Sequence, residues 1–434
     1  MSRNPHWRRH ATILCGIVTL AVSLASPDAM AGPRNTAAPA GESLSDAVTA
    51  RLLGTTRQLR PDLAATADRA DTTVDVRRKQ GAWAFGTAVV RAPHVDGAYP
   101  EGHLFLARRT GNTWRIAFDS DTGFATLADT APMMSAAERH TFGTSSTAPS
   151  SSSSSITSKL TAAADYRTGM RLPFALGQDW ILRGGPHGFA GTDTPWTAID
   201  LKGGDQRVLA AAGGTAYTIC SSGKGWIRVY HPPLYSGGPR LATDYYHLVG
   251  NPAFSGQHVD EGAFLGNTGT DVSCGGEASS RHVHFSLGTY GTSPNPPSDR
   301  TKIAIAGHAF GGWVIRSGSA AYEGYALHGS AKCTANGDGG ATCMHNYGKL
   351  ALNQGIVDAN GSASVTRRSG PGDGNASAGT VADGATVTVS CTGTGTSHTG
   401  RWGTTTLWDR LSDGTWIPDA FLYTGVNGAI KGAC

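Results

Sequence analysis

Charged residues and long apolar runs are both scarce in this chain. Lysine, arginine, aspartate and glutamate make up 16% of its 434 residues, and the formal net charge is only +4. Nucleic-acid binding needs a concentrated positive surface, which this balance does not indicate. The apolar stretch near the N-terminus is shorter than the ~20 residues that a membrane-spanning helix needs. We therefore expect no nucleic-acid partner and no stable insertion into a membrane.

Two familiar metal-binding patterns are also missing. There is no C-x-x-C pair of the kind used by cysteine zinc sites, and no H-E-x-x-H helix that would supply a glutamate base. Long helical periodicity is absent too. The chain instead has 59 glycines and 21 prolines that punctuate short strand-like runs. These features predict a mainly β protein, and the length predicts two to four domains.

The N-terminus has the three parts of a secretory signal peptide. It begins with a basic region of three arginines, continues with an apolar stretch over residues 11–24, and reaches an A-x-A cleavage site that ends at Ala31. We therefore predict a signal peptide over residues 1–31 and a secreted, extracellular protein. A twin-arginine signal and a lipoprotein site at Cys15 are alternatives, but the neighbouring residues fit neither well.

The cysteines predict disulfide bonds. One of the seven lies in the predicted signal peptide, which leaves six for the oxidising extracellular compartment. Six cysteines allow fifteen pairings, and the sequence alone does not choose among them. Nearest-neighbour pairing is the simplest expectation, and it joins Cys220 to Cys274, Cys333 to Cys343 and Cys391 to Cys434.

Composition divides the rest of the chain into four segments. Residues 32–143 predict a small α+β unit of the propeptide type, with a helix that begins after Ser43. Residues 144–159 form a serine-rich linker open to proteolysis. Residues 160–355 carry most of the histidines and predict an antiparallel β domain. Residues 360–434 predict a small β-barrel that one disulfide would help to stabilise.

The segment RHVHFSL, residues 281–287, is the most informative stretch of the chain. It reads as a β-strand, so His282 and His284 lie on one face and the apolar residues on the other. At a rise of about 3.3 Å per residue, the two positions are ~6.5–7 Å apart. This spacing suits one imidazole on a metal ion and the other on the molecule that the metal binds. Two packed strand histidines are the simpler alternative.

Upstream residues could complete a zinc site. Catalytic zinc uses three protein ligands and leaves a fourth position open. His187 follows a Gly-Gly-Pro sequence that predicts a turn. Asp200 lies between isoleucine and leucine where a strand is predicted to start, and a buried carboxylate needs a partner, of which a metal ion is one. A turn or capping role for Asp200 remains open.

Five separated segments resemble the M23 family of zinc metallopeptidases, specifically its beta-lytic or LasA-like branch. The resemblance covers roughly residues 165–350 and leaves out the flanking segments. In chain order the segments are GPH (185–187), AID (198–200), YHL (246–248), VDEGAFLGNTG (259–269) and HVHF (282–285).

The resemblance implies a role for each matching residue. His187, Asp200 and His284 would bind one zinc ion. His247 and His282 would be catalytic histidines that act on the water and on the developing oxyanion, and the division of work between them stays open. Zinc chemistry agrees, because zinc lowers the pKa of bound water to about 7, where imidazole also exchanges protons.

The resemblance also implies a substrate. It predicts a monomeric zinc endopeptidase that hydrolyses peptide cross-links of bacterial peptidoglycan, with Gly-containing bonds as the leading expectation. One alternative is a non-catalytic cell-wall-binding protein, which loss of a ligand or of a catalytic histidine would favour. Another is a secreted protease that acts on Gly-rich proteins.

The last unit resembles a second family. Residues 406–416, TLWDRLSDGTW, followed by IPDA, resemble bacterial SH3-like domains, which implies cell-wall binding through exposed aromatic side chains. The same tryptophans could instead form the core of a small barrel. Gly, Ser and Ala are frequent over residues 361–379, which predicts a flexible connection that lets the unit move independently.

Three smaller features carry expectations of their own. Residues 259–269 predict a hairpin that leads back toward the His282 strand. Residues 336–339, NGDG, resemble a calcium loop only superficially, and we expect a hairpin closed by Cys333 and Cys343. Tyr246 could stabilise an oxyanion or simply pack in the core. We expect no functional role for four further histidines: His308, His328, His345 and His398.

Overall fold

The computed structural model describes residues 42–59, 67–94, 98–145, 165–188, 193–291 and 302–434. The predicted signal peptide and most of the serine-rich linker lie outside these residues. Within them the chain is mainly β, as the sequence predicts, and its strands form five sheets. No helix in these ranges is long and apolar enough to cross a membrane.

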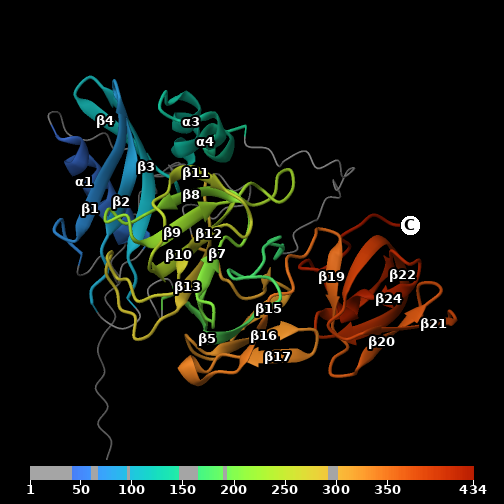
Figure 1. Cartoon of the computed structure of the whole chain (residues 1–434). Helices are drawn as coiled ribbons and strands as arrows, with labels where there is room; N and C mark the ends of the chain where they lie inside the picture. Colours follow the sequence, from blue (N-terminus) through green and yellow to red (C-terminus); the bar gives the residue numbers. More distant parts are fainter. Residues whose placement is uncertain (1–41, 60–66, 95–97, 146–164, 189–192, 292–301) are drawn as a thin grey trace, which may run out of the picture. The chain divides into compact units, whose positions relative to one another are not determined.

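The first unit is a four-stranded antiparallel sheet with helices on both faces (Figure 1). Its strands, in sheet order, are β1 (Thr72–Gln80), β2 (Trp83–Val90), β3 (Glu101–Thr110) and β4 (Thr113–Phe118). Its helices are α1 (Leu44–Leu59), α3 (Thr122–Thr130) and α4 (Ala136–Phe142). Successive strand residues supply the two faces, since Ala84 packs with α1 and Phe85 packs with α3 and α4.

Helix α1 begins where the sequence predicts. The Ser43 hydroxyl accepts a hydrogen bond from the Asp46 amide at 3.1 Å, which satisfies one of the free N–H groups of the first turn. Leu44, Val48 and Leu52 then recur on one face and are all buried.

The central sheet contains the histidine strand. It has eight antiparallel strands in the order β11-β8-β9-β10-β13-β6-β5-β18. Their bounds are β5 (Asp179–Gly188), β6 (Trp196–Lys202), β8 (Gly214–Thr218), β9 (Gly225–Tyr230), β10 (Leu241–Leu248), β11 (Ser255–Val259), β13 (Val283–Thr289) and β18 (Thr342–His345).

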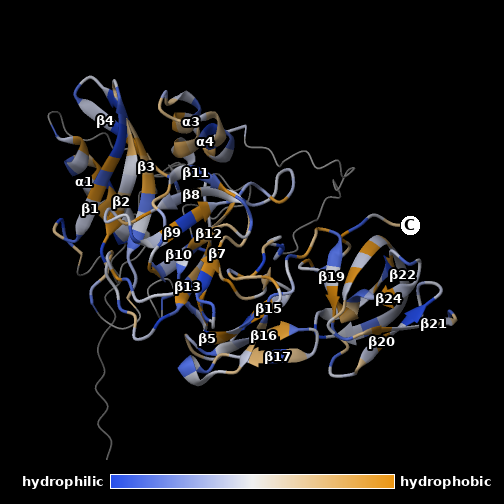
Figure 2. Ribbon diagram, in the orientation of Figure 1, coloured by the Kyte–Doolittle hydropathy of each residue, from blue (hydrophilic) through white to orange (hydrophobic). Residues whose placement is uncertain are grey.

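Two smaller sheets accompany the central one. The first pairs β7 (Arg207–Leu209) with β12 (Phe264–Asn267). The second is the antiparallel meander β14 (Ala309–Phe310), β15 (Trp313–Ser317), β16 (Gly324–His328) and β17 (Ala331–Thr334). Figure 2 shows hydrophobic residues along the central strands, and one core cluster joins this sheet to the meander, with the Phe285 and Phe310 rings 5.3 Å apart.

The hairpin predicted over residues 259–269 is wrong. Strand β11 pairs with β8, and β12 pairs with β7, so the two strands belong to different sheets. Each finds its partner far away in the sequence, where Val259 and Leu265 enter the shared core. The chain nevertheless returns to the histidine strand, because Gly269 forms a β-bridge with His282.

The C-terminal unit is a seven-stranded sheet in the order β21-β20-β24-β23-β22-β19-β25. Its strands are β19 (Gln354–Val357), β20 (Ser364–Arg368), β21 (Ser377–Ala382), β22 (Thr386–Gly400), β23 (Gly403–Leu411), β24 (Trp416–Pro418) and β25 (Leu422–Tyr423). Trp408 and Trp416 are buried, so these two tryptophans pack the unit. Its likeness to SH3-like domains stays a prediction.

The flexible connection predicted over residues 361–379 is wrong. Strand β20 lies within this range and pairs with β21, which begins within it. The Asn375 side chain donates hydrogen bonds to the carbonyls of Pro371 and Gly372, which holds the intervening turn. A composition rich in small residues here reflects tight turns rather than an unfolded linker.

The three disulfides follow nearest-neighbour pairing, as expected: Cys220–Cys274, Cys333–Cys343 and Cys391–Cys434. The second does not close a hairpin, however. Strand β17 pairs with β16, and β18 pairs with β5, so this disulfide joins two different sheets. Residues 337–339 between them form a short 3-10 helix, η1 (Gly337–Gly339).

Candidate metal centre

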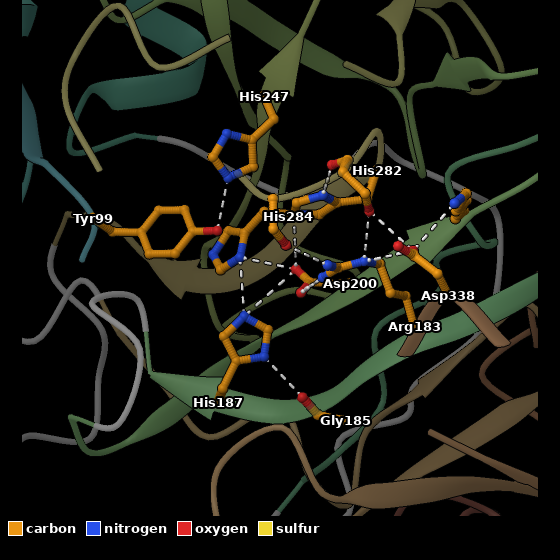
Figure 3. Close-up of polar contacts among 12 residues, drawn as sticks. Tyr99, Arg183, Gly185, His187, Asp200, His247, His282, His284 and Asp338 are labelled. Carbon is orange, nitrogen blue, oxygen red and sulfur yellow. Dashed lines mark hydrogen bonds and ion pairs between the residues drawn. The ribbon is translucent and has the colours of Figure 1, made fainter. Parts of the chain in front are cut away.

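Three adjacent strands bring His187, Asp200 and His284 together. In the sheet β6 lies between β5 and β13, and Asp200 is directly opposite His284. Ligand atoms of the three residues all lie within 4.8 Å of one another, and it is the one such group found among the described residues. All three side chains are buried. Figure 3 shows them converging from their separate strands.

Strand alternation explains why these side chains share a face. Ile199, Leu201, Val283 and Phe285 are fully buried in the core cluster on the opposite face. Asp200 and His284 must therefore point away from that core. The prediction of strands with polar residues on one side is confirmed for Asp200 and His284, whereas His282 precedes β13 and forms a β-bridge with Gly269.

The turn predicted at Gly184–His187 is wrong, because this segment is part of strand β5. Three irregularities in its pairing with β6 absorb the Gly-Gly-Pro sequence without ending the strand. Glycine is needed here for space, since a Cβ on Gly185 would lie 2.5 Å from the carbonyl oxygen of Glu323. The bulged strand aims His187 at the cluster.

The distances within the cluster suit a shared cation. His187 Nε2 lies 3.1 Å from His284 Nδ1. Asp200 Oδ1 lies 3.5 Å from His187 Nε2 and 3.3 Å from His284 Nδ1. His187 Nδ1 lies 2.8 Å from the carbonyl oxygen of Gly185. A carbonyl only accepts, so Nδ1 carries the proton and Nε2 presents its lone pair to the cluster.

The electrostatics of the cluster also suit a metal ion. Burial lowers the pKa of His187, and it lowers the pKa of His284 to about 4, so both imidazoles are neutral at pH 7. Burial alone would raise the pKa of Asp200, but the surrounding histidines hold it well below its usual value. Two neutral imidazoles and one carboxylate are a donor set that zinc prefers, so the residues fit this ion.

The other two histidines of the motif stand beside the cluster. The rings of His247 and His282 are 4.8 Å apart, and His282 Nε2 lies 3.6 Å from Asp200 Oδ1. His247 Nδ1 donates to the carbonyl of Asp271 at 2.9 Å, and His282 Nδ1 donates to that of Ser280 at 2.7 Å. In each ring Nε2 is therefore the nitrogen that is not bonded to a backbone carbonyl.

His247 has two signs of an unusual environment. Its φ is +67°, a left-handed conformation that is uncommon in non-glycine residues and recurs at functional sites. Burial, followed by the neighbouring His282 and His284, lowers its pKa well below the usual value. A neutral imidazole in a strained, buried position is typical of a residue with a chemical task.

Arg183 supports Asp200, although no pattern in the sequence indicates this role. Its Nη1 lies 3.4 Å from Asp200 Oδ2, and its Nε donates to Asp338 Oδ1 at 2.9 Å. Asp338 in turn accepts hydrogen bonds from Lys202 and Ser280. The NGDG segment thus supplies a second layer of contacts to the metal centre, and no spacing in the sequence indicates this.

Two tyrosines also enter the site without a signal in the sequence. The Tyr322 ring stacks on His187 at 4.0 Å, and the Tyr99 ring stacks on His284 at 4.0 Å. Tyr246, by contrast, is buried and its hydroxyl donates to the Gly275 carbonyl at 2.7 Å. Core packing is therefore the role that its contacts support.

The four histidines expected to be ordinary lie in other surroundings. His308 and His328 are buried, and His328 stacks on Tyr347 at 3.8 Å. His345 pairs with Asp179 and His398 with Asp373. None of the four is among the residues of the metal-type cluster.

A buried cluster of two imidazoles and a carboxylate, flanked by two further histidines, is the arrangement of a hydrolytic metal centre. No family model matches the chain. Among curated proteins it is similar to Protease LasA of Pseudomonas aeruginosa, with 28% identity over 165 residues that cover 36% of this chain and 35% of that protein. The chain thus spans about a third of that relative's length.

A second similarity concerns a shorter stretch. The chain is 32% identical to the uncharacterized protein YraI of Bacillus subtilis over 93 residues, which cover 20% of this chain and 78% of YraI. Over that stretch the chain belongs to the same family as YraI.

Solved structures show likenesses as well. One is the M23 metalloprotease pseudoalterin from the deep sea, with 25% identity, a TM-score of 0.32, and coverage of 38% of this chain and 94% of that one. Another is lysostaphin from Staphylococcus simulans, with 14% identity, a TM-score of 0.21, and coverage of 58% and 92%.

Proposed function

We propose that this protein is a secreted zinc endopeptidase that hydrolyses peptide cross-links of bacterial peptidoglycan. The observation that carries the proposal is the buried cluster of His187, Asp200 and His284, with the imidazoles of His247 and His282 beside it. The similarity to a protease supports the reaction class. Gly-containing bonds are the preferred targets in this proposal.

His187, Asp200 and His284 would hold the zinc ion, and the charge of Asp200 would offset part of the charge of the cation. Zinc bound there would acidify water to a pKa of about 7 and polarise a peptide carbonyl. The protonated Nδ1 of His187 and its carbonyl partner fix the orientation of this ligand. Arg183 holds the Asp200 carboxylate from the other side.

His247 and His282 would move the protons. Each has its Nδ1 proton committed to a backbone carbonyl, so its Nε2 is the atom that accepts a proton from the attacking water. The resulting imidazolium would stabilise the oxyanion or protonate the leaving amine. Either histidine can start this sequence.

The flanking units complete the proposal. Residues 32–143 would be an inhibitory or chaperone-like propeptide, removed by cleavage in the serine-rich linker, and the C-terminal unit would bind the cell wall. Secretion would follow from the predicted signal peptide. The enzyme would act as a monomer.

Lysis of purified cell walls tests the function. The assay uses the full chain after limited proteolysis in the linker, with and without a chelator, and is repeated with His284→Ala. We expect lysis that the chelator abolishes and that the variant lacks. Lysis that persists under both conditions would contradict the zinc mechanism.

The same preparation separates the rival functions. Wall fragments are analysed for newly formed amino groups, and a Gly-rich protein is offered in parallel. New amino groups at glycine in wall fragments support the proposal. Wall binding without new amino groups would indicate a non-catalytic wall-binding protein, and cleavage of the protein substrate alone would indicate a general protease.

A further inference from the structure

A segment of the first unit enters the metal centre. Between β2 and β3 the chain leaves the N-terminal sheet, and Tyr99, which is 3% exposed, lies at the far end of this connection. Its hydroxyl lies 2.8 Å from His247 Nε2, and its ring is 4.0 Å from the His284 ring at an angle of 24°. Figure 3 shows the side chain pointing between these two histidines.

Backbone contacts hold this segment against the loop before the histidine strand. The Ala92 amide donates to the Cys274 carbonyl at 3.2 Å, and the Gly276 amide donates to the Ala92 carbonyl at 3.4 Å. A Cβ on Gly275 would lie 2.2 Å from Ala92 O, and one on Gly276 would lie 2.2 Å from Ala98 O. Only glycines at these two positions allow such a close approach.

Charged contacts immediately after Tyr99 fasten the same segment. Arg228 Nη1 donates to the Gly102 carbonyl at 3.0 Å, and Lys302 pairs with Glu101 at 2.8 Å. Since Arg228 and Lys302 belong to the histidine-bearing part of the chain, Tyr99 is fixed by contacts that span the two units.

We propose that Tyr99 keeps the intact chain inactive by filling the position that a substrate carbonyl must enter. The inference rests on the proposed function and identifies the residue responsible for inhibition. The Tyr99 hydroxyl is hydrogen-bonded to His247 Nε2, the ring nitrogen of His247 that is not bonded to Asp271. The ring covers His284, so inhibition is both steric and through a hydrogen bond.

The test measures access to the metal rather than catalysis. Uncleaved wild-type chain, Tyr99→Ala and Tyr99→Phe are loaded with zinc, and a chromogenic chelator follows the rate of zinc release. We expect Tyr99→Ala to release zinc at least about tenfold faster than wild type. Tyr99→Phe keeps the ring and loses the hydroxyl, so it should fall between the two.

Tyr290→Ala is the matched control. Tyr290 is equally buried, belongs to the same cluster and contacts Phe142 of the first unit at 5.8 Å. It should leave zinc release near the wild-type rate. Equal release from wild type and Tyr99→Ala would overturn the inference, as would equal acceleration by Tyr290→Ala, which would indicate general loosening.

The zinc-release result for Tyr99→Ala can be distinguished from the result of the peptidase assay on the cleaved chain. If Tyr99→Ala accelerates zinc release but the cleaved chain hydrolyses no peptide, Tyr99 still closes the metal centre, and the proposed function fails together with the inhibition of it. If the cleaved chain lyses walls and Tyr99→Ala changes nothing, the proposed function stands and the inference fails.

A second observation, independent of the metal centre, concerns a cavity of about 520 Å³. Its lining comes from the meander, from the C-terminal unit and from the segment before β5, and includes Tyr166, Arg316, Tyr325, Arg401, Trp402 and Tyr423. The wall is well packed: the Tyr423 hydroxyl donates to the Gly307 carbonyl at 2.6 Å, and the Trp402 and Tyr423 rings are 4.8 Å apart.

One cation in this cavity has no acidic partner. Arg401 is paired with Asp358, but no ion pair of Arg316 is found among the described residues. The Arg316 guanidinium instead lies 5.8 Å from the centre of the Trp402 ring. An unpaired guanidinium beside aromatic faces is suited to a carboxylate attached to an apolar group.

We infer that this cavity binds the free C-terminal carboxylate of a short peptide, with Arg316 on the carboxylate and Trp402 against the adjoining side chain. Such a terminus could come from an uncross-linked wall peptide or from a hydrolysis product. Both sources share the chemistry that the cavity recognises.

Titration calorimetry with the full chain tests this inference. The probes are an acetylated peptide ending in D-alanine with a free carboxylate, its amide, and the same pair ending in glycine. We expect the acids to bind and the amides to bind at least about tenfold more weakly. Preference for D-alanine would indicate wall peptides as the source, and preference for glycine would indicate products.

Arg316→Ala should abolish binding. Arg410 is an exposed arginine of the C-terminal unit outside the cavity lining, so Arg410→Ala should bind the peptide normally. Equal affinity for acid and amide, binding by Arg316→Ala, or no binding at millimolar peptide would overturn the inference.

Discussion

Arg183 reaches the carboxylate of Asp200, with Nη1 3.4 Å from Oδ2. The contact connects a proposed metal ligand to Asp338, which lies on the segment between Cys333 and Cys343. A residue that orients a ligand in this way affects metal affinity without touching the metal.

Arg183→Ala should weaken zinc binding by about 10–100-fold, the usual cost of losing such a supporting contact. Arg183→Lys, which keeps the charge but not the forked geometry, should lose less. Competition titration with a zinc chelator measures both. Arg207 is an exposed arginine of the same domain, so Arg207→Ala is the control and should bind zinc normally. Unchanged affinity in Arg183→Ala would contradict the supporting role.

Removal of the Cys333–Cys343 disulfide should have a related but smaller effect on zinc. The double substitution Cys333→Ser and Cys343→Ser frees the segment that positions Asp338, and should lower the free energy of unfolding by about 2–4 kcal/mol. Thermal unfolding and the zinc titration check both parts. A zinc affinity lower than that of Arg183→Ala would show that the disulfide acts on the site by another route.

His282→Ala and His284→Ala should separate catalysis from metal binding. His284→Ala should lose stoichiometric zinc, because it removes one of three ligands. His282→Ala should keep zinc and lose about 10²–10⁴-fold in turnover, the range expected for a proton-transferring group. Metal analysis and wall hydrolysis by the linker-cleaved chain check the pair. Loss of zinc in His282→Ala would assign that residue to the metal instead.

The first unit should lose stability in alkaline solution. Burial alone would lower the pKa of His103, but its contacts with Asp119 and Glu101 outweigh burial and raise the pKa from 6.5 to about 9. A group with a raised pKa in the folded state stabilises fully below pH 6.5, and its contribution disappears as the pH rises through about 9. Arg228 and Tyr230 also face Asp119, and Lys302 faces Glu101.

The expected loss between pH 6.5 and 9 is on the order of 3 kcal/mol, since one pKa unit corresponds to about 1.4 kcal/mol. Denaturant unfolding of the full chain at several pH values measures it. His103→Gln, which cannot titrate, should show a shallower decline over this range. Identical pH dependence in the two proteins would show that other groups are responsible.

Local pattern was enough to predict the faces of the site strands. Period-two alternation puts Asp200 and His284 opposite a set of apolar residues that need burial, and this holds whatever the strands pair with. The start of helix α1 at Ser43 was predictable for the same reason, because a cap depends on a few neighbouring residues.

Pairing over long distances decided what local pattern could not. The Gly-Gly-Pro sequence before His187 predicts a turn, yet hydrogen bonds to β6 keep it in a bulged strand. The segment over residues 259–269 predicts a hairpin, yet each half finds a more distant partner. Turn propensities are small and can be overridden when a strand gains a whole row of hydrogen bonds and a buried face.

The sequence by itself determined the chemistry of the centre: which residues could hold a metal, and that two more histidines accompany them. Only the tertiary structure decided what surrounds that centre. Asp338 and Tyr99 reach it from remote parts of the chain, whereas Arg183 reaches it from the strand that carries His187, and no periodicity records such contacts. Alternation within a strand is a local property, whereas the approach of a side chain from another unit depends on how complete surfaces pack together.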